Sequence, residues 1–312
     1  MTTFWTRLRR LIQGSKKILI ATHLDPDGDA VCSALALAHV FRRWRRKPQL
    51  YCVNDIPDRY SFLAGVDDFR TAYDRYDLLV IVDTAKIKRV AHDFSPLGER
   101  IINIDHHKSN EGFGILKVID PRASSSCELI YKLLSANRFR IDRHLAEILY
   151  SGLFAETGGF TYANTTPEAV KTAYELIRLG ARPYRVAKHI TARTEAALKL
   201  LGLVLHSLRV DDGIAVSCLT KEMLRQSGAR STDSENFVSL MLTMEGVKVA
   251  LFIREADDSK LKISLRSDGR VDVDKIAAQF GGGGHRTAAG LRTSRSRAEI
   301  EAGLVAAIRA AM

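Results

Sequence analysis

Acidic and histidine side chains follow three hydrophobic runs in the first half of the chain, KKILIAT, DLLVIVD and RIINID. Seven residues share this placement: His23, Asp27, Asp29, Asp83, Asp105, His106 and His107. In open α/β sheets the carboxyl ends of parallel strands meet at one edge, and sites form there. Pro26 and Gly28 favour a tight loop that turns the first three side chains inward. We therefore expect one shared site at a sheet edge.

The chemistry that suits these residue types is metal binding. Neighbouring carboxylates disfavour joint ionisation unless cations neutralise them. Oxygen ligands with a few imidazoles and no thiolate favour Mn²⁺ or Mg²⁺ over a structural zinc ion. This number of ligands suits two ions that share a bridging carboxylate, as in phosphate-ester chemistry. The pattern predicts two divalent ions, Mn²⁺ first, with Mg²⁺ or Co²⁺ as alternatives.

Each of these residues also has an ordinary structural interpretation. A single Asp after a strand usually caps a helix or forms a turn. Caps and turns rarely produce three strand-end acidic positions together, the last of them followed by two histidines. The combined pattern therefore favours a metal site over separate caps.

The elements that must position these side chains are predicted from periodicity. Apolar runs of strand length alternate with helical patterns, which indicates an α/β lobe with a mostly parallel sheet. Strands are expected at residues 16–23, 49–54, 77–83 and 100–105. Helices are expected at residues 30–47 and 143–155. A further helix is expected after Thr166, which would cap it, with Pro167 at its first position and Gly180 at its end.

The second half of the chain predicts a smaller, mixed α/β lobe. Residues 186–208 have a continuous helical pattern, so we interpret them as a helical connector between domains at 1–185 and 209–312. Further strands are expected at 213–219, 248–255 and 260–267, and helices at 271–280 and after Ser296, with Glu299 three positions later.

A glycine run with basic neighbours marks a second candidate site. Glycines 281–284 allow a backbone to approach a ligand closely and, ahead of a helix, would present N–H groups to an anion. His285 and Arg286 follow directly, and Ser264 and Arg266 lie in the neighbouring expected strand. The pattern predicts an anion pocket, because the arginine fork suits phosphate. The alternative is a tight turn that only packs a helix on a sheet.

Composition narrows the class of protein. The 46% apolar and 27% charged content excludes a disordered chain, and the net charge of +11 suits polyanionic partners or simply a basic surface. The basic cluster in residues 42–47 is interpreted as a solvated helix end. The four cysteines form no Cys-x-x-Cys pair, so we expect reduced packing residues. We see no signal peptide and no bilayer-spanning run, so we expect a cytoplasmic protein without a membrane partner.

The run Asp105-His106-His107, together with HLDPDGDA, resembles the DHH phosphoesterases, and GGGGHRTAAG adds a resemblance to their subgroup with a C-terminal DHHA1 lobe. That subgroup consists of nano-RNA nucleases that also remove the 3′ phosphate of adenosine 3′,5′-bisphosphate (pAp). The resemblance extends from His23 to Gly290. It implies a parallel-sheet DHH lobe and a smaller DHHA1 lobe, with the active site in the cleft between them.

The resemblance also implies ligand sets. One ion would be held by His23, Asp27 and Asp83. The other would be held by Asp29, Asp83, His106 and Glu156. Glu156 stands where the family commonly has aspartate. Glutamate keeps the charge but adds a methylene, which would shift the second ion or weaken its binding.

The resemblance implies the catalytic and binding roles as well. Asp83 would bridge the ions, His107 would face the scissile phosphate, and Asp105 would orient a neighbouring imidazole. In the second lobe the nucleotide would be bound by Ser264, Arg266, Gly283, Gly284, His285 and Arg286.

The implied activity is hydrolysis of short oligoribonucleotides to 5′ mononucleotides and of pAp to AMP and phosphate. Short RNA or DNA oligonucleotides and pAp are the expected substrates. Relatives of this kind are often dimers, so a homodimer is an open expectation. Two alternatives remain: a phosphodiesterase acting on cyclic or linear dinucleotides, and a nucleotide-binding regulator with catalysis weakened at Glu156.

Overall fold

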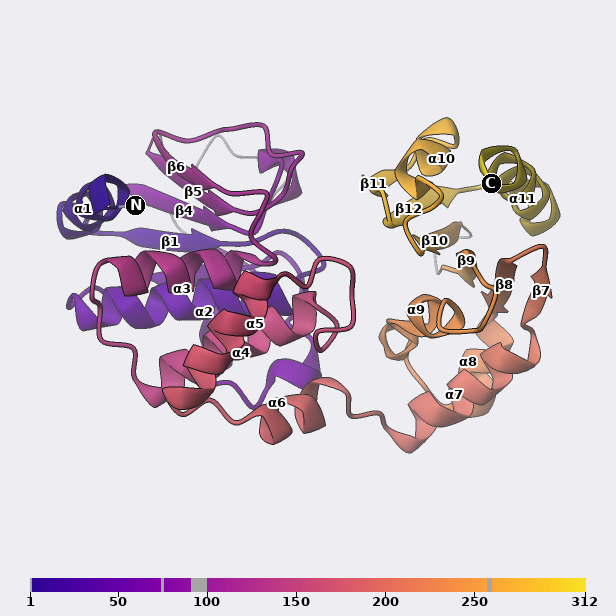
Figure 1. Ribbon diagram of the computed structural model, residues 1–312, viewed down its shortest axis with the longest axis horizontal. Helices are drawn as coiled ribbons and strands as arrows, with labels where there is room; N and C mark the ends of the chain where they lie inside the picture. Colours follow the sequence, from indigo (N-terminus) through magenta and orange to yellow (C-terminus); the bar gives the residue numbers. More distant parts are fainter. Residues whose placement is uncertain (1, 74–75, 91–99, 257–259) are drawn as a thin grey trace. The chain divides into compact units, whose positions relative to one another are not determined.

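The chain forms two compact units, Met1–Ala192 and Arg193–Met312, each with its own sheet and helices (Figure 1). The computed structural model describes residues 2–73, 76–90, 100–256 and 260–312. The boundary between the units falls inside the segment 186–208.

The first unit contains a six-stranded sheet in the order β3-β2-β1-β4-β5-β6. Every pairing in it is parallel, which confirms the predicted α/β lobe. Its strands are β1 (Ile18–Ala21), β2 (Gln49–Tyr51), β3 (Phe69–Arg70), β4 (Leu78–Val82), β5 (Ile101–Asp105) and β6 (Leu116–Ile119). The sequence pattern missed β3 and β6 because β3 has only two residues and β6 is mostly half-exposed or exposed.

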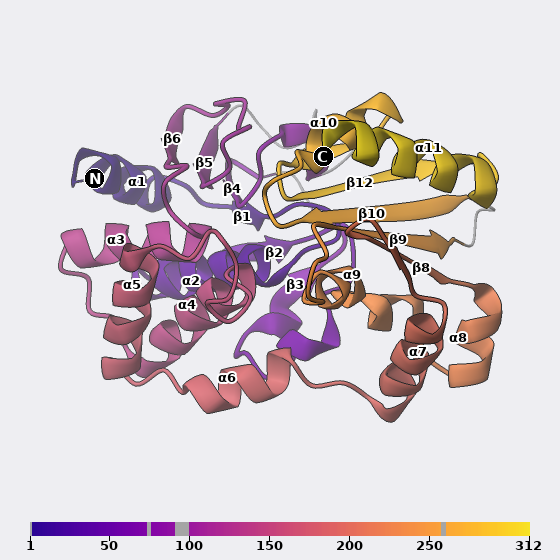
Figure 2. The ribbon, with the colours of Figure 1, turned by 45° about the vertical axis from the view of Figure 1, so that its right-hand side comes forward.

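Helices α2 to α5 lie together beside this sheet (Figures 1 and 2). The helices of the unit are α1 (Thr2–Gln13), α2 (Gly28–Arg43), α3 (Ser126–Ala136), α4 (Arg143–Glu156), α5 (Pro167–Arg178) and α6 (Pro183–Ile190). Alternate strand residues point to opposite faces of a sheet. Accordingly, Ile18 and Ile20 join the large core with α2, whereas Leu19 and Ala21 join a smaller cluster with Tyr51.

The continuous helix predicted over residues 186–208 is wrong. Helix α6 ends at Ile190, and α7 (Glu195–His206) begins after Thr194, whose side chain accepts the Ala197 N–H at 3.0 Å. A threonine cap satisfies an N–H that has no partner inside the helix, so it starts a new helix. Hydrophobic periodicity continues across the cap and therefore did not reveal the break.

The second unit contains a mixed six-stranded sheet in the order β11-β12-β10-β9-β8-β7. Only the β8–β9 pairing is parallel among its described strands, which confirms the mixed lobe. Its strands are β7 (Arg209–Asp211), β8 (Ile214–Leu219), β9 (Val249–Glu255), β10 (Leu261–Ser267), β11 (Gly283–His285) and β12 (Ala288–Thr293). Its other helices are α8 (Lys221–Ser227), α9 (Phe237–Met241), α10 (Val273–Gln279) and α11 (Arg297–Ala311).

The glycine run does not precede a helix, contrary to the prediction. It follows α10, and Gly283, Gly284 and His285 form the edge strand β11, which pairs with β12. A Cβ on Gly284 would lie 2.4 Å from the Ala288 carbonyl oxygen. The absence of side chains here therefore allows close strand pairing, which a local pattern does not show.

Two smaller expectations can be compared with the structure. All four cysteines are unpaired and buried, as expected of packing residues. Within the described ranges, no helix combines the length and the apolar character that a bilayer crossing requires.

Candidate metal centre

Asp83 connects two groups of ligand-type side chains in the first unit. It directly follows β4, and its φ of 52° lies in the left-handed region that residues other than glycine rarely adopt. Such a backbone conformation costs free energy and tends to occur at functional sites. Asp83 is buried, with an exposed fraction of 1%.

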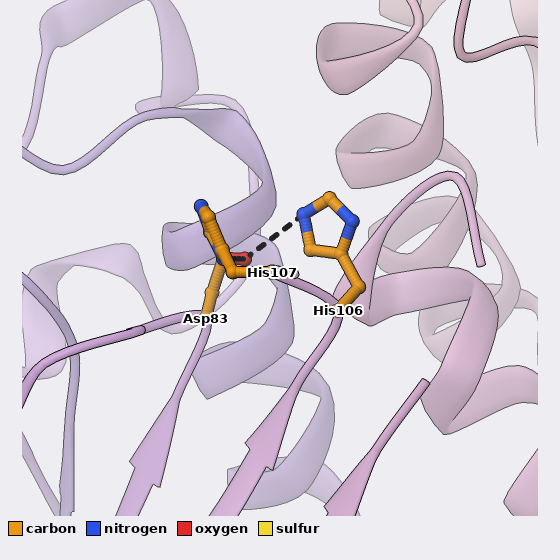
Figure 3. A group of neighbouring side chains, drawn as sticks. All are labelled: Asp83, His106 and His107. Carbon is orange, nitrogen blue, oxygen red and sulfur yellow. Dashed lines mark ion pairs between the residues drawn. The ribbon is translucent and has the colours of Figure 1, made fainter. Parts of the chain in front are cut away.

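Two groups of three residues form around this carboxylate, and within each group the ligand atoms lie within 4.8 Å of one another. The first group is His23, Asp27 and Asp83. The second is Asp83, His106 and His107 (Figure 3). The two Asp83 oxygens divide between them: Oδ2 is 3.8 Å from His23 Nε2, and Oδ1 is 3.5 Å from His106 Nε2. One carboxylate therefore faces both groups.

Backbone carbonyls hold both of these imidazoles in place. The Nδ1 of His23 is 2.8 Å from the Leu24 carbonyl oxygen, and the Nδ1 of His106 is 3.2 Å from that of Ala123. Carbonyls accept, so each Nδ1 carries the proton in these contacts. Metal-bound histidines commonly donate one ring N–H in this way. The Nε2 atoms are then directed toward Asp83.

Asp29, in the first turn of α2, is buried beside the second group and contacts the beginning of α3. Its carboxylate accepts the N–H groups of Ser126 at 2.5 Å and Cys127 at 2.9 Å, and its Oδ2 is 3.9 Å from His106 Nε2. Burial raises the pKa of Asp29 well above its ordinary value, and the charges of Asp83 and Asp27 raise it further. Deprotonated Asp29 therefore requires positive charge nearby.

The histidines change the proton affinity of Asp83. Burial raises the pKa of Asp83, but the hydrogen bond with His23 and the positive charges of His107 and His106 lower it below its ordinary value. Among the described residues, only histidines form ion pairs with Asp29 and Asp83. Imidazole nitrogens and buried carboxylate oxygens without a lysine or arginine partner fit divalent cations.

Asp105 positions the second histidine of the run. Its Oδ1 accepts from His107 Nδ1 at 2.7 Å and from the His106 backbone N–H at 2.9 Å. Burial lowers the pKa of His107, but the hydrogen bond to Asp105 and the charge of Asp83 raise it to about 9. With Asp105 and Asp83 as its neighbours, the His107 ring is therefore protonated at neutral pH.

Two polar residues at the centre were missed by the sequence analysis. Ser126 donates from Oγ to Asp83 Oδ1 at 2.9 Å, and Asn110 donates from Nδ2 to Asp105 Oδ2 at 2.5 Å. Neither has a spacing that distinguishes it from a turn or cap residue. Ser126 lies 43 residues from Asp83 along the chain, so only the fold brings the two together.

Glu156 belongs to neither three-residue group among the described residues. It is the last residue of α4, and its backbone carbonyl accepts from Asn164 Nδ2 at 3.1 Å. Asp29 is also outside both groups, although it approaches His106. Metal binding stays a prediction for Glu156 and Asp29, as it does for the members of the two groups.

In the second unit, strand register brings most of the predicted binding residues together. Ala288 of β12 pairs with Arg266 on one side and His285 on the other. Gly290 similarly pairs with Ser264 and Gly283. These residues occupy adjacent rows of one sheet.

Two arginine contacts complete this region. Arg254, which the sequence analysis missed, donates from Nη2 to Ser264 Oγ at 2.8 Å. Arg286 donates from Nε and Nη2 to the Gly269 carbonyl oxygen, each at 3.2 Å. Its guanidinium therefore also fixes the turn after β10.

Two family models match most of the chain. Residues 17–153 match the N-terminal domain of the DHH family, and residues 211–312 match the DHHA1 domain. The chain is 32% identical to the bifunctional oligoribonuclease and PAP phosphatase NrnA of Thermus thermophilus, over 92% of this chain and 88% of that one. It is 27% identical to NrnA of Bacillus subtilis, over 91% and 92%.

Solved structures share the fold. An exopolyphosphatase-related protein from Bacteroides fragilis aligns with a TM-score of 0.92 and 29% identity, covering 100% of this chain and 98% of that one. RecJ of Thermus thermophilus in complex with Mn²⁺ aligns with a TM-score of 0.58 and 13% identity, covering 99% of this chain and 54% of that one. The second likeness shows the fold alone. The chain belongs to the DHH family, with a DHHA1 domain following its DHH domain.

Proposed function

We propose that this chain is a metal-dependent phosphoesterase that hydrolyses short oligoribonucleotides to 5′ mononucleotides and pAp to AMP and phosphate. The observation that carries the proposal is the division of the Asp83 oxygens between His23 and His106. A carboxylate shared in this way suits a pair of metal ions in phosphate-ester chemistry. The NrnA relatives, named as oligoribonuclease and PAP phosphatase, supply the substrate class.

The proposed cofactors are two divalent ions, with Mn²⁺ first. His23, Asp27 and Asp83 would hold one ion, and Asp83 and His106, with Asp29 and Glu156 as further ligands, would hold the other. When bound, the ions would lower the pKa of a water molecule and neutralise charge on the phosphate. The oxygen and imidazole donors, without a thiolate, are the basis for placing Mn²⁺ first.

His107 would act on the phosphate rather than only on a metal. Its Nδ1–H is held by Asp105 at 2.7 Å, which fixes the orientation of the ring, and its Nε2–H would donate to a phosphate oxygen. A protonated imidazole can stabilise charge there and give a proton to the leaving oxygen. Asp105 would keep the ring in that orientation.

The DHHA1 domain would bind the part of the substrate that does not react. Arg266 and His285 flank Ala288, and Ser264 and Gly283 flank Gly290. Together with Gly284 and Arg286, these residues would hold a phosphate and the nucleotide. Binding energy from such remote groups positions the reacting centre.

The test is a product profile on pAp, short RNA oligomers of increasing length and a cyclic dinucleotide, with Mn²⁺ present. We expect phosphate release from pAp and 5′ mononucleotides from the shortest RNAs. Asp83→Asn should abolish both, since it removes the shared charge while asparagine tolerates the left-handed backbone. Asp25→Asn is the matched control, because Asp25 also has a positive φ of 53° but is exposed and outside both groups.

Two results would contradict the proposal. Binding of pAp without phosphate release would favour a nucleotide-binding regulator. Hydrolysis of the cyclic dinucleotide alone would favour the dinucleotide phosphodiesterase.

A further inference from the structure

A basic hollow of about 970 Å³ lies in the first unit, where α2 ends and β2 begins. We define the basic hollow by its charged lining residues, which are Arg42, Arg45, Arg46, Lys47, Arg70 and Asp68. Five of these are cationic and one is acidic. The sequence analysis interpreted the segment 42–47 as a solvated helix end. The structure adds Arg70 from the edge strand β3 and makes the surface concave.

The basic hollow is separate from the metal centre. Helix α2 has Asp27 as its cap and Asp29 in its first turn, whereas Arg42 lies in its last turn. A helix of 16 residues is about 24 Å long. The hollow therefore lies at the end of α2 remote from the ligand groups.

Several contacts hold the walls of the hollow in place. Arg46 donates from Nη2 to the Gln13 carbonyl oxygen, and Arg70 donates from Nη1 to the Asp67 and Phe69 carbonyl oxygens at 2.6 and 2.8 Å. Gln49 donates from Nε2 to the Ala72 carbonyl oxygen at 2.8 Å, which ties β2 to the segment after β3. These carbonyl bonds position two guanidinium groups without neutralising them.

The positive charge in the hollow is largely uncompensated. Asp68 pairs with Arg42 at 2.6 Å. Arg45 and Lys47 are exposed and form no ion pair with any residue that the structure describes. Like charges held together repel one another, and a bound anion would relieve that repulsion.

We propose that the basic hollow is a second anion site, which binds a compact ligand carrying two or more phosphate groups. Guanidinium and ammonium groups arranged around one concavity suit phosphate oxygens. Its volume lies in the range of small-molecule sites. Single-stranded nucleic acids are usually held by aromatic stacking as well as charge, and no aromatic residue lines this hollow among the described residues. The lining therefore favours a compact polyphosphate over a long strand.

The probe is inorganic tripolyphosphate, titrated into the full chain by calorimetry at low and high salt. We expect saturable binding that weakens as salt rises, because exposed charges are screened. Arg45→Asn with Lys47→Gln should weaken it at least about tenfold, since two phosphate contacts are lost. Asparagine suits position 45, where φ is 59°. Asp83→Asn should retain the binding, which separates this site from the metal centre.

The matched control is Lys171→Gln with Lys188→Gln, which removes the same charge from exposed positions on α5 and α6. We expect it to bind tripolyphosphate as the wild type does. Three results would overturn the proposal: equal weakening in both double variants, loss of binding in Asp83→Asn, or binding of a long single-stranded RNA through the hollow without binding of tripolyphosphate. Hydrolysis of pAp plays no part in this test, so failure here leaves the proposed function intact.

Discussion

His107 donates a 2.7 Å hydrogen bond from Nδ1 to Oδ1 of Asp105, the residue two positions before it. The other oxygen of Asp105 accepts from Asn110. The carboxylate is thus fixed on both sides, and the imidazole ring is fixed with it. This relationship gives the second histidine of the run a role different from that of the first, whose Nδ1 bonds to a backbone carbonyl.

Asp105→Asn should lower the rate of pAp hydrolysis by about 10- to 100-fold, the usual effect of losing a residue that orients a site histidine. Loss of the carboxylate charge should also lower the pKa of His107, because in the wild type the hydrogen bond to Asp105 and the charge of Asp105 raise it. The alkaline limb of the pH–rate profile should therefore move to lower pH. Asp120→Asn is the control, since Asp120 pairs with the exposed Arg122. An unchanged profile in Asp105→Asn would refute the positioning role.

His23→Ala and His106→Ala should each remove one Mn²⁺ ion and leave the other, because each histidine belongs to only one of the two groups. Calorimetric titration with Mn²⁺ gives the number of ions per chain. His144→Ala, at an exposed position on α4, should bind as the wild type does. If either site variant kept both ions or lost both, the division into two groups would be wrong.

Gly152→Ala should destabilise the first unit by about 1–3 kcal/mol, the usual cost of overpacking. The added Cβ would lie 2.3 Å from Cys127 Sγ and 3.2 Å from Asp29 Oδ1, so it would also disturb a predicted metal ligand. The change in the free energy of unfolding can be measured by urea denaturation.

Gly202→Ala is the control for that measurement. Gly202 lies within α7, and its added Cβ would meet nothing within 4 Å among the described residues. Alanine should stabilise that helix by about 0.5–1 kcal/mol. Equal destabilisation by both substitutions would contradict the packing argument.

Glu147→Gln should lower the melting temperature at neutral pH. Burial raises the pKa of Glu147, but Arg182 and Arg185 lower it below the ordinary value of 4.5. A carboxyl with a lowered folded pKa stabilises the protein above its unfolded pKa and loses that contribution as the pH falls through its folded pKa. The difference in melting temperature between Glu147→Gln and the wild type should therefore be largest near pH 7 and should shrink below about pH 4.5.

Scanning calorimetry over a series of pH values measures this difference. Glu195→Gln is the control, because Glu195 is 83% exposed in its pair with Lys199 and such pairs contribute little. If the difference in melting temperature grew as the pH fell, the predicted direction of the Glu147 effect would be wrong.

The sequence by itself determined the parallel sheet of the first unit and the placement of Asp83 and Asp105 at strand ends. Both follow from local patterns: a short apolar run predicts a buried strand, and the residue after it lies at the sheet edge. The caps of α5 and α11 were predictable for the same reason, since a cap is a contact within one turn of helix.

Only the tertiary structure decided which atoms meet. The two oxygens of Asp83 face different histidines, Ser126 reaches Asp83 from the first position of α3, and the end of the glycine run lies in a strand rather than at a helix start. The basic hollow likewise needs Arg70 from a strand remote from residues 42–47. These contacts join segments far apart in the chain, and a local pattern does not specify strand register, helix packing or side-chain direction.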